Sequence, residues 1–166
     1  MIRRMLTDLY AANLAYAHRL TDGLDEDASV AMPAAGMNHP RWIIGHLGGT
    51  ADHMAAMHFF GLEKTQPAAW RELFGPVSQP VADASVYPLL TELLTSLDER
   101  HTAVTTAVLA ATPDFFERTC PDTLPEGFRK RFPTVGTALL HIMIGHENMH
   151  LGQLSAWRRV QGLPSV

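Results

Sequence analysis

The sequence predicts an all-α fold, a four-helix bundle formed by residues 1–166 as a single domain. Three observations lead to this prediction. Four segments place apolar residues at the spacing of one helix face. No segment shows a convincing alternation of apolar and polar residues bounded by turns, as a β-strand would. Stretches containing Pro or Gly separate the four segments.

The first helix is expected over residues 2–21, because the Asp22-Gly23 pair breaks the pattern that precedes it. Residues 24–38 have no strong period and are interpreted as a loop. The inward face of the first helix, at 4-3-4-3-4 spacing, is predicted to comprise Ile2, Leu6, Leu9, Asn13, Tyr16 and Leu20.

The second helix is expected to follow Asn38, whose side chain suits an N-cap, with Pro40 in the first turn, where proline is tolerated. Gly61 supplies a C-terminal stop. Residues 61–85 contain several prolines and form a long connection. The predicted inward face comprises Trp42, His46, Gly49, His53 and Phe60.

The third helix is predicted to run from about Val86 to Ala111, with Ser85 as a possible cap. A second proline-rich link leads to Thr134, which can cap a fourth helix that ends before Gly162. The inward face of the third helix is expected to comprise Leu90, Leu94, Leu97, His101, Val104 and Val108.

The four helices match in length, each being roughly 30 to 40 Å long at ~1.5 Å per residue, which favours a bundle. Two connections are long enough to cross the length of the bundle, so a crossover topology is possible and a simple up-down order is not required.

Composition excludes several classes of protein. The net charge of -4 and a pI near 6.1 provide no basic surface for nucleic acid. No window approaches the ~18 apolar residues of a membrane span, and the first ten residues lack the apolar core of a signal peptide. The single Cys120 cannot form an intramolecular disulfide. We therefore expect a cytoplasmic protein with a small-molecule partner and neither a nucleic-acid nor a membrane partner.

The chain contains nine histidines, and the fourth helix holds the most informative pair. At about 100° per residue, His146 and His150 fall on its inward face, whereas His141 falls on the opposite, solvated face. His18 and His58 lie off the inward faces of their own helices and are expected at the surface.

Two imidazoles at positions i and i+4 can converge on one metal ion. The alternative is a hydrogen-bonded pair of core histidines, but burial of two adjacent imidazoles without a partner is costly. His46 and His53 on the second helix are separated by ~10.5 Å along the axis, so only one can join a mononuclear site. Periodicity does not decide between them. Three imidazoles leave a fourth position for water or substrate, as in catalytic zinc sites.

Glu147 lies beside the histidine pair and could serve as a base or accept a hydrogen bond from an imidazole, although a surface position is an equal alternative. Residues 146–150 also match the zincin motif H-E-x-x-H. The metzincin extension would require Gly at 153 and His at 156, where this chain has Gln153 and Ala156. Only 16 residues follow His150 in the sequence, so a peptidase is disfavoured.

The inward-facing Asn13 and His101 could hydrogen-bond a ligand or line its pocket, and a role in the core is an equal alternative for both.

Two motifs give the chain a resemblance to the DinB-like superfamily of four-helix-bundle metal-binding proteins. One is W-x-x-x-H-L at residues 42–47; the other is H-x-x-x-H-x-x-Q at residues 146–153, followed by Arg158, Arg159 and Gly162-Leu163-Pro164. The resemblance implies that His46, His146 and His150 bind a divalent metal ion, commonly zinc or nickel. It also implies an up-down-down-up bundle that is often a homodimer.

Similar proteins include thiol-dependent S-transferases, thiol-dependent isomerases and hydrolases, so the resemblance alone does not fix a reaction. The leading hypothesis is a metal-dependent transferase that uses a low-molecular-weight thiol as cosubstrate. One alternative is a metal-dependent hydrolase that uses metal-bound water. The other is a non-catalytic metal-binding or stress-response protein, which would have a closed site with four protein ligands.

Overall fold

A computed structural model describes residues 2–166, and the regular structure in this range is helical, apart from an isolated β-bridge between Thr119 and Thr134. The predicted all-α class is confirmed. In chain order the elements are α1 (Ile2–Thr21), η1 (Ala28–Val30), α2 (Pro40–Thr50), η2 (Ala51–Phe59), α3 (Trp70–Phe74), η3 (Ala84–Val86), α4 (Leu90–Ala110), α5 (Pro113–Glu117), α6 (Glu126–Arg131), α7 (Val135–Leu140), η4 (His141–His146) and α8 (Glu147–Val160).

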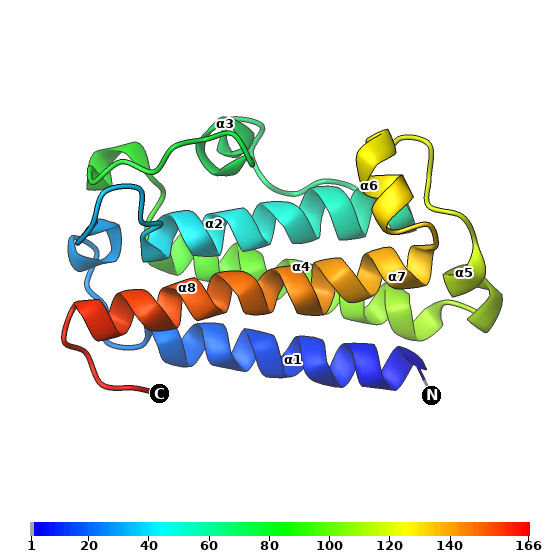
Figure 1. The fold of residues 1–166 in the computed structure, drawn as a ribbon, viewed down its shortest axis with the longest axis horizontal. Helices are drawn as coiled ribbons and strands as arrows, with labels where there is room; N and C mark the ends of the chain where they lie inside the picture. The colour runs from blue at the N-terminus through cyan, green and yellow to red at the C-terminus, as the bar shows by residue number, and fades with distance from the viewer. Residues whose placement is uncertain (1) are drawn as a thin grey trace.

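Four long helical rods make up the body of the molecule (Figure 1). They are α1, α2 continued by the π-helical segment η2, α4, and α7 continued by the π-helical segment η4 and then α8. The α1 and α7–α8 rods run in one direction, and the α2 and α4 rods run in the other (Figure 1). Both α2 and α1 pack against α4 and α8.

Two of the four helix starts differ from the expected positions, that of α2 by one residue and that of α4 by about four. His39, not Asn38, is the N-cap of α2, and its Nδ1 accepts a hydrogen bond from the backbone N–H of Trp42 at 3.2 Å. Ser85 lies in η3, where Asp83 accepts its backbone N–H, so α4 begins only at Leu90. Thr134 caps α7 as predicted.

The two long connections contain short helices that the sequence pattern did not predict. The connection between η2 and α4 includes α3, which packs against α2. The connection between α4 and α7 includes α5 and α6 at one end of the rods (Figure 1). Within residues 2–166, no helix combines the length and the apolar character that crossing a bilayer requires.

Two apolar clusters fill the interior, one around Val104 and Leu139 and the other around Ile43 and Leu97. Buried polar residues separate the two clusters along three of the rods. Asn13 on α1, His101 on α4 and Glu147 on α8 each stand between a residue of one cluster and a residue of the other. A polar layer therefore crosses the middle of the molecule.

Candidate metal centre

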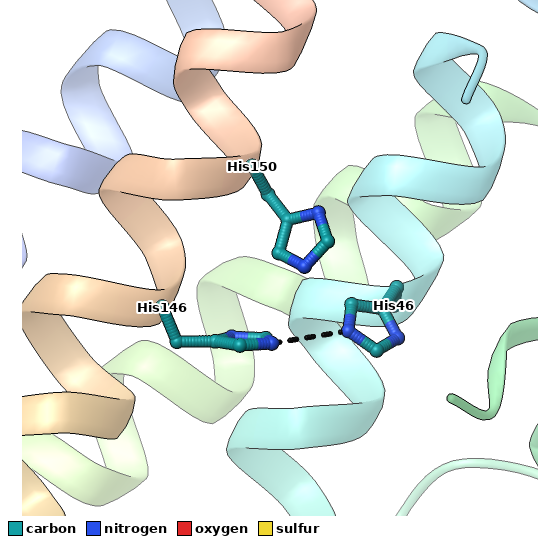
Figure 2. A group of neighbouring side chains, drawn as sticks. All are labelled: His46, His146 and His150. Carbon is teal, nitrogen blue, oxygen red and sulfur yellow. Dashed lines mark hydrogen bonds between the residues drawn. The ribbon is translucent and has the colours of Figure 1, made fainter. Parts of the chain in front are cut away.

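Three histidine side chains meet between α2 and the α7–α8 rod (Figure 2). His46 comes from α2, His146 ends η4 and His150 lies one helical turn later on α8. One nitrogen of each ring lies within 4.8 Å of the corresponding nitrogens of the other two. The structure thus brings together the three residues singled out from the sequence, and it selects His46 over His53.

Hydrogen bonds orient two of the three rings. His46 Nδ1 donates to the backbone carbonyl of Phe74 at 2.7 Å. His150 Nδ1 donates to the side-chain oxygen of Gln153 at 3.1 Å, and the same oxygen accepts a bond from Asn38 at 3.0 Å. Both rings therefore turn Nε2 toward the meeting point, where it is available as a metal ligand.

The pKa of each of the three imidazoles is lowered, which favours the neutral form that binds a metal. Burial lowers the pKa of His146 to about 3, helped by His150 and His46, and burial lowers that of His150 to about 4. Burial also lowers the pKa of His46, although its bond to the carbonyl of Phe74 opposes the shift.

The donor set fits a tetrahedral divalent ion. Ligand nitrogens around zinc are separated by about 3.3 Å, given Zn–N distances of ~2.0–2.1 Å. His46 Nε2 and His146 Nε2 are already 3.1 Å apart, and their contact is the dashed line in Figure 2. His146 Nδ1 is buried and has no hydrogen-bond partner among residues 2–166. Small side-chain adjustments of His46, His146 and His150 would suffice to hold the ion.

Trp42 and Gly45 explain how the first turns of α2 place His46. The indole of Trp42 stacks on the His46 ring at 4.7 Å and 8°, and its Nε1 donates to Ser78 Oγ at 2.8 Å. A Cβ on Gly45 would approach the Phe74 ring to 2.4 Å. Glycine at this position therefore lets Phe74 close over α2 and offer its carbonyl to His46.

Glu147 faces the interior and not the three histidines. His101 Nε2 donates to one of its carboxylate oxygens at 2.8 Å, and Asn13 donates to the other at 3.3 Å. Tyr10 stacks on the His101 ring at 3.6 Å. Burial raises the pKa of Glu147, while the bond from His101 opposes the shift. Glu147 is thus a buried member of the polar layer, together with the inward-facing Asn13 and His101.

A cavity of about 730 Å³ opens beside the histidine cluster, and both His46 and His146 line it. His53, His58 and His141 also line it. His58 and His141, which were predicted at the surface, are half-buried at the cavity: His58 bonds Thr123 Oγ1 at 2.9 Å, and His141 stacks on Phe132 at 4.2 Å. His18 lies at the surface as predicted and pairs with Asp98.

Two contributors to this centre were not predicted from the sequence, the carbonyl of Phe74 and Gly45. The carbonyl of Phe74 comes from a short helix inside a predicted loop, and a backbone acceptor leaves no mark on residue type. Gly45 could have been noticed as a glycine inside a helical pattern, which often marks a close approach.

A family model described as the DinB superfamily matches residues 9–154 of the chain. The search of curated proteins found no match to the chain.

Proposed function

This chain belongs to the DinB superfamily, and from that membership and its three-histidine cluster we propose that it is a metal-dependent S-transferase. The substrates are a low-molecular-weight thiol and a small electrophile. The ion is divalent, with zinc or nickel fitting the all-imidazole donor set.

One observation carries the proposal: three imidazole nitrogens converge, and two of the three rings, His46 and His146, line a large cavity. A small molecule inside that cavity would therefore lie against two of the three rings that would hold the ion. Within residues 2–166 the cluster has three members, which favours an open site over a closed structural one.

A divalent ion at this site would supply a Lewis acid that favours the thiolate form of a thiol. The protein's own groups would orient the ligand histidines and enclose the reacting thiol. Phe74 and Gln153 fix the tautomers of His46 and His150. Apolar side chains such as Phe74, Phe128 and Ile142 line the cavity and limit the water around a reacting thiol.

The opposed directions of the rods support the up-down-down-up bundle that the resemblance implied, and we include this topology in the proposal (Figure 1). The homodimer stays a prediction, which light scattering of the purified protein tests.

Metal analysis of purified protein is the first test. We expect close to one equivalent of a divalent ion in wild type and a negligible amount in the His146→Ala/His150→Ala variant. His141→Ala is the matched control, because its ring lies 6.1 Å from that of His146 and outside the cluster. It should retain the ion. Equal, negligible metal in wild type and the double variant would refute the proposal at its first step.

The reaction itself is tested with the metal-loaded protein. A panel of low-molecular-weight thiols is offered with a chlorinated electrophile, beside ester and amide substrates without thiol. We expect thioether formation that depends on both thiol and metal. Hydrolysis of an ester or amide without thiol would instead indicate a metal-dependent hydrolase, and no turnover in either assay would favour a non-catalytic metal-binding protein.

A further inference from the structure

The cavity beside the three histidines is also lined by positively charged side chains. Its volume of about 730 Å³ lies within the range of small-molecule sites, ~300–1,000 Å³. The connection after η2 and the short helix α3 contribute Lys64 and Arg71 to its lining. The lining of the cavity therefore combines two of the three clustered histidines with two cations.

Neither cation forms an ion pair within residues 2–166. Asp52 is the one carboxylate among the described residues that line the cavity. It is already engaged, since Arg100 lies 3.3 Å from its Oδ1 and the backbone N–H of Thr65 donates to the same oxygen at 3.1 Å. The two positive charges are thus left without a neutralising group in the cavity.

His53 adds a third polar group to the same region. Its Nδ1 is buried without a hydrogen-bond partner, and its ring packs edge-on against that of His58 at 4.8 Å. The pKa of His53 is lowered to about 4, first by burial and then by Lys64, His58 and Arg71, while Asp52 opposes the shift. The charges of Lys64 and Arg71 therefore act on a neutral imidazole, which can donate one hydrogen bond to an anion.

We propose that Lys64, Arg71 and His53 form a subsite for the carboxylate of a small-molecule substrate. Apolar side chains that line the same cavity, among them Met54, Trp70 and Phe74, would hold the body of that molecule. The inference deepens the proposed function and rests on it, because the substrate's reactive end would then lie at the three histidines.

The electrostatics favour an anion over a neutral ligand of the same shape. A charge-assisted hydrogen bond contributes more than a neutral one, but both cations are exposed, and water and salt reduce the gain. We therefore expect a preference of about tenfold for a carboxylate over its amide, which corresponds to roughly 1.4 kcal/mol.

Calorimetric titration with phenylacetate and phenylacetamide tests the subsite, because the two probes differ mainly in charge. Wild-type zinc-loaded protein should bind phenylacetate about tenfold more tightly, and added salt should reduce the difference. In the Lys64→Gln/Arg71→Gln variant the ratio should fall to about one, with phenylacetamide binding unchanged. The Arg4→Gln/Arg159→Gln variant loses the same charge from α1 and α8, outside the cavity lining, and should retain the preference.

Three results would overturn the subsite: no binding of phenylacetate, equal binding of acid and amide by wild type, or a preference that survives in the Lys64→Gln/Arg71→Gln variant. The zinc content of each sample is measured beforehand. Absence of zinc would then count against the proposed function, whereas the acid-to-amide ratio tests the subsite separately.

The carboxylate could belong to the thiol or to the electrophile, and competition distinguishes the two. Displacement of phenylacetate by 3-mercaptopropionate, but not by 2-mercaptoethanol, would assign it to the thiol. Binding of 3-mercaptopropionate without displacement would assign it to the electrophile.

Discussion

Gln153 shows at the scale of one residue why a glutamine follows the second histidine of the H-x-x-x-H-x-x-Q motif. Three positions after His150 on the same helix, its side-chain oxygen reaches back to His150 Nδ1 at 3.1 Å. The same oxygen accepts a bond from Asn38, which precedes α2. One amide thus fixes the tautomer of a ligand histidine and ties it to the start of another helix.

Replacing Gln153 with alanine should lower zinc affinity about tenfold, because loss of such a hydrogen-bond partner typically costs ten- to a hundredfold. Competition with a chromophoric chelator measures the change. Asn148→Ala is the matched control, since Asn148 is exposed on the same helix and bonds only the carbonyl of Ile144. Equal affinities of the two variants would show that Gln153 does not support the site.

His39 predicts a pH dependence of stability that is independent of the metal site. Its pKa is lowered from 6.5 to about 4, first by burial and also by the Arg41 guanidinium. The folded protein thus binds fewer protons here than the unfolded chain does. The stabilisation is fully present above pH 6.5 and is lost as the pH falls toward 4. Between pH 7.5 and pH 5.0 the loss from this group is about 2 kcal/mol.

The His39→Asn variant isolates that contribution, because asparagine can still accept the N–H of Trp42 as an N-cap but does not titrate. Urea unfolding at the two pH values should show wild type losing about 2 kcal/mol more than the variant. Parallel losses in the two proteins would contradict the assignment.

At the scale of the element, the two π-helical segments explain most of the cases in which a side chain predicted to point inward is exposed, or the reverse, on the second and fourth predicted helices. An extra residue in a turn rotates everything after it by about 100° relative to a regular α-helix. Glu147, placed at the edge of the inward face by regular phasing, is therefore buried, and Gln153 is exposed. Phe59 rather than Phe60 is buried at the end of η2 for the same reason. Periodicity calculated at a constant angle cannot detect such a turn.

The first helix was misread for a different reason. Its sequence is compatible with two inward faces of equal regularity, one through Leu9 and Tyr16 and the other through Tyr10 and Ala17. The face through Leu9 and Tyr16 is the more apolar. The structure instead buries Tyr10 and Ala17 and leaves Leu9 exposed. Tyr10 faces inward because its ring stacks on His101, a contact between helices that is distant in sequence.

The histidine cluster could be predicted because its geometry is local. His146 and His150 lie four residues apart, and that spacing keeps them together on one side of α8. Their partner was less determined: periodicity allowed both His46 and His53, and only the resemblance favoured His46. The cavity could not be predicted, since loop residues with no period form much of its lining.

The packing of α3 on α2 leads to a prediction about Gly45. A methyl group at this position would meet the buried Phe74 ring at 2.4 Å, so Phe74 must move and its carbonyl would shift away from His46 Nδ1. We expect Gly45→Ala to weaken zinc binding by about tenfold or more and to destabilise the fold by roughly 1 to 3 kcal/mol. Chelator competition and urea unfolding measure the two effects.

Gly152→Ala is the control for that variant, because it also replaces a helical glycine but its Cβ would meet nothing within 4 Å. It should leave zinc affinity unchanged and stabilise the protein by about 0.5 to 1 kcal/mol. A Gly45→Ala protein that binds zinc as wild type does would mean that the carbonyl of Phe74 is dispensable.

At the scale of the whole molecule, a polar layer separates two apolar cores, and the metal centre would connect two of the four rods. The cluster around Leu139 lies on one side of the layer and the cluster around Leu97 on the other. His46 belongs to one rod, and His146 and His150 to another. An ion held by all three would therefore join α2 to the α7–α8 rod.

The metal should for this reason stabilise the entire fold, because an ion that binds only the folded chain adds its binding free energy to folding. At a free zinc concentration a hundred times the dissociation constant, the gain is about 2.7 kcal/mol. For a chain of this length that raises the melting temperature by roughly 5 to 10 °C. Calorimetry of zinc-loaded wild type should show this increase, and excess chelator should remove it. The His146→Ala/His150→Ala variant should melt at the same temperature with and without chelator. An unchanged melt of wild type whose zinc loading and removal have been verified would separate metal binding from the stability of the fold.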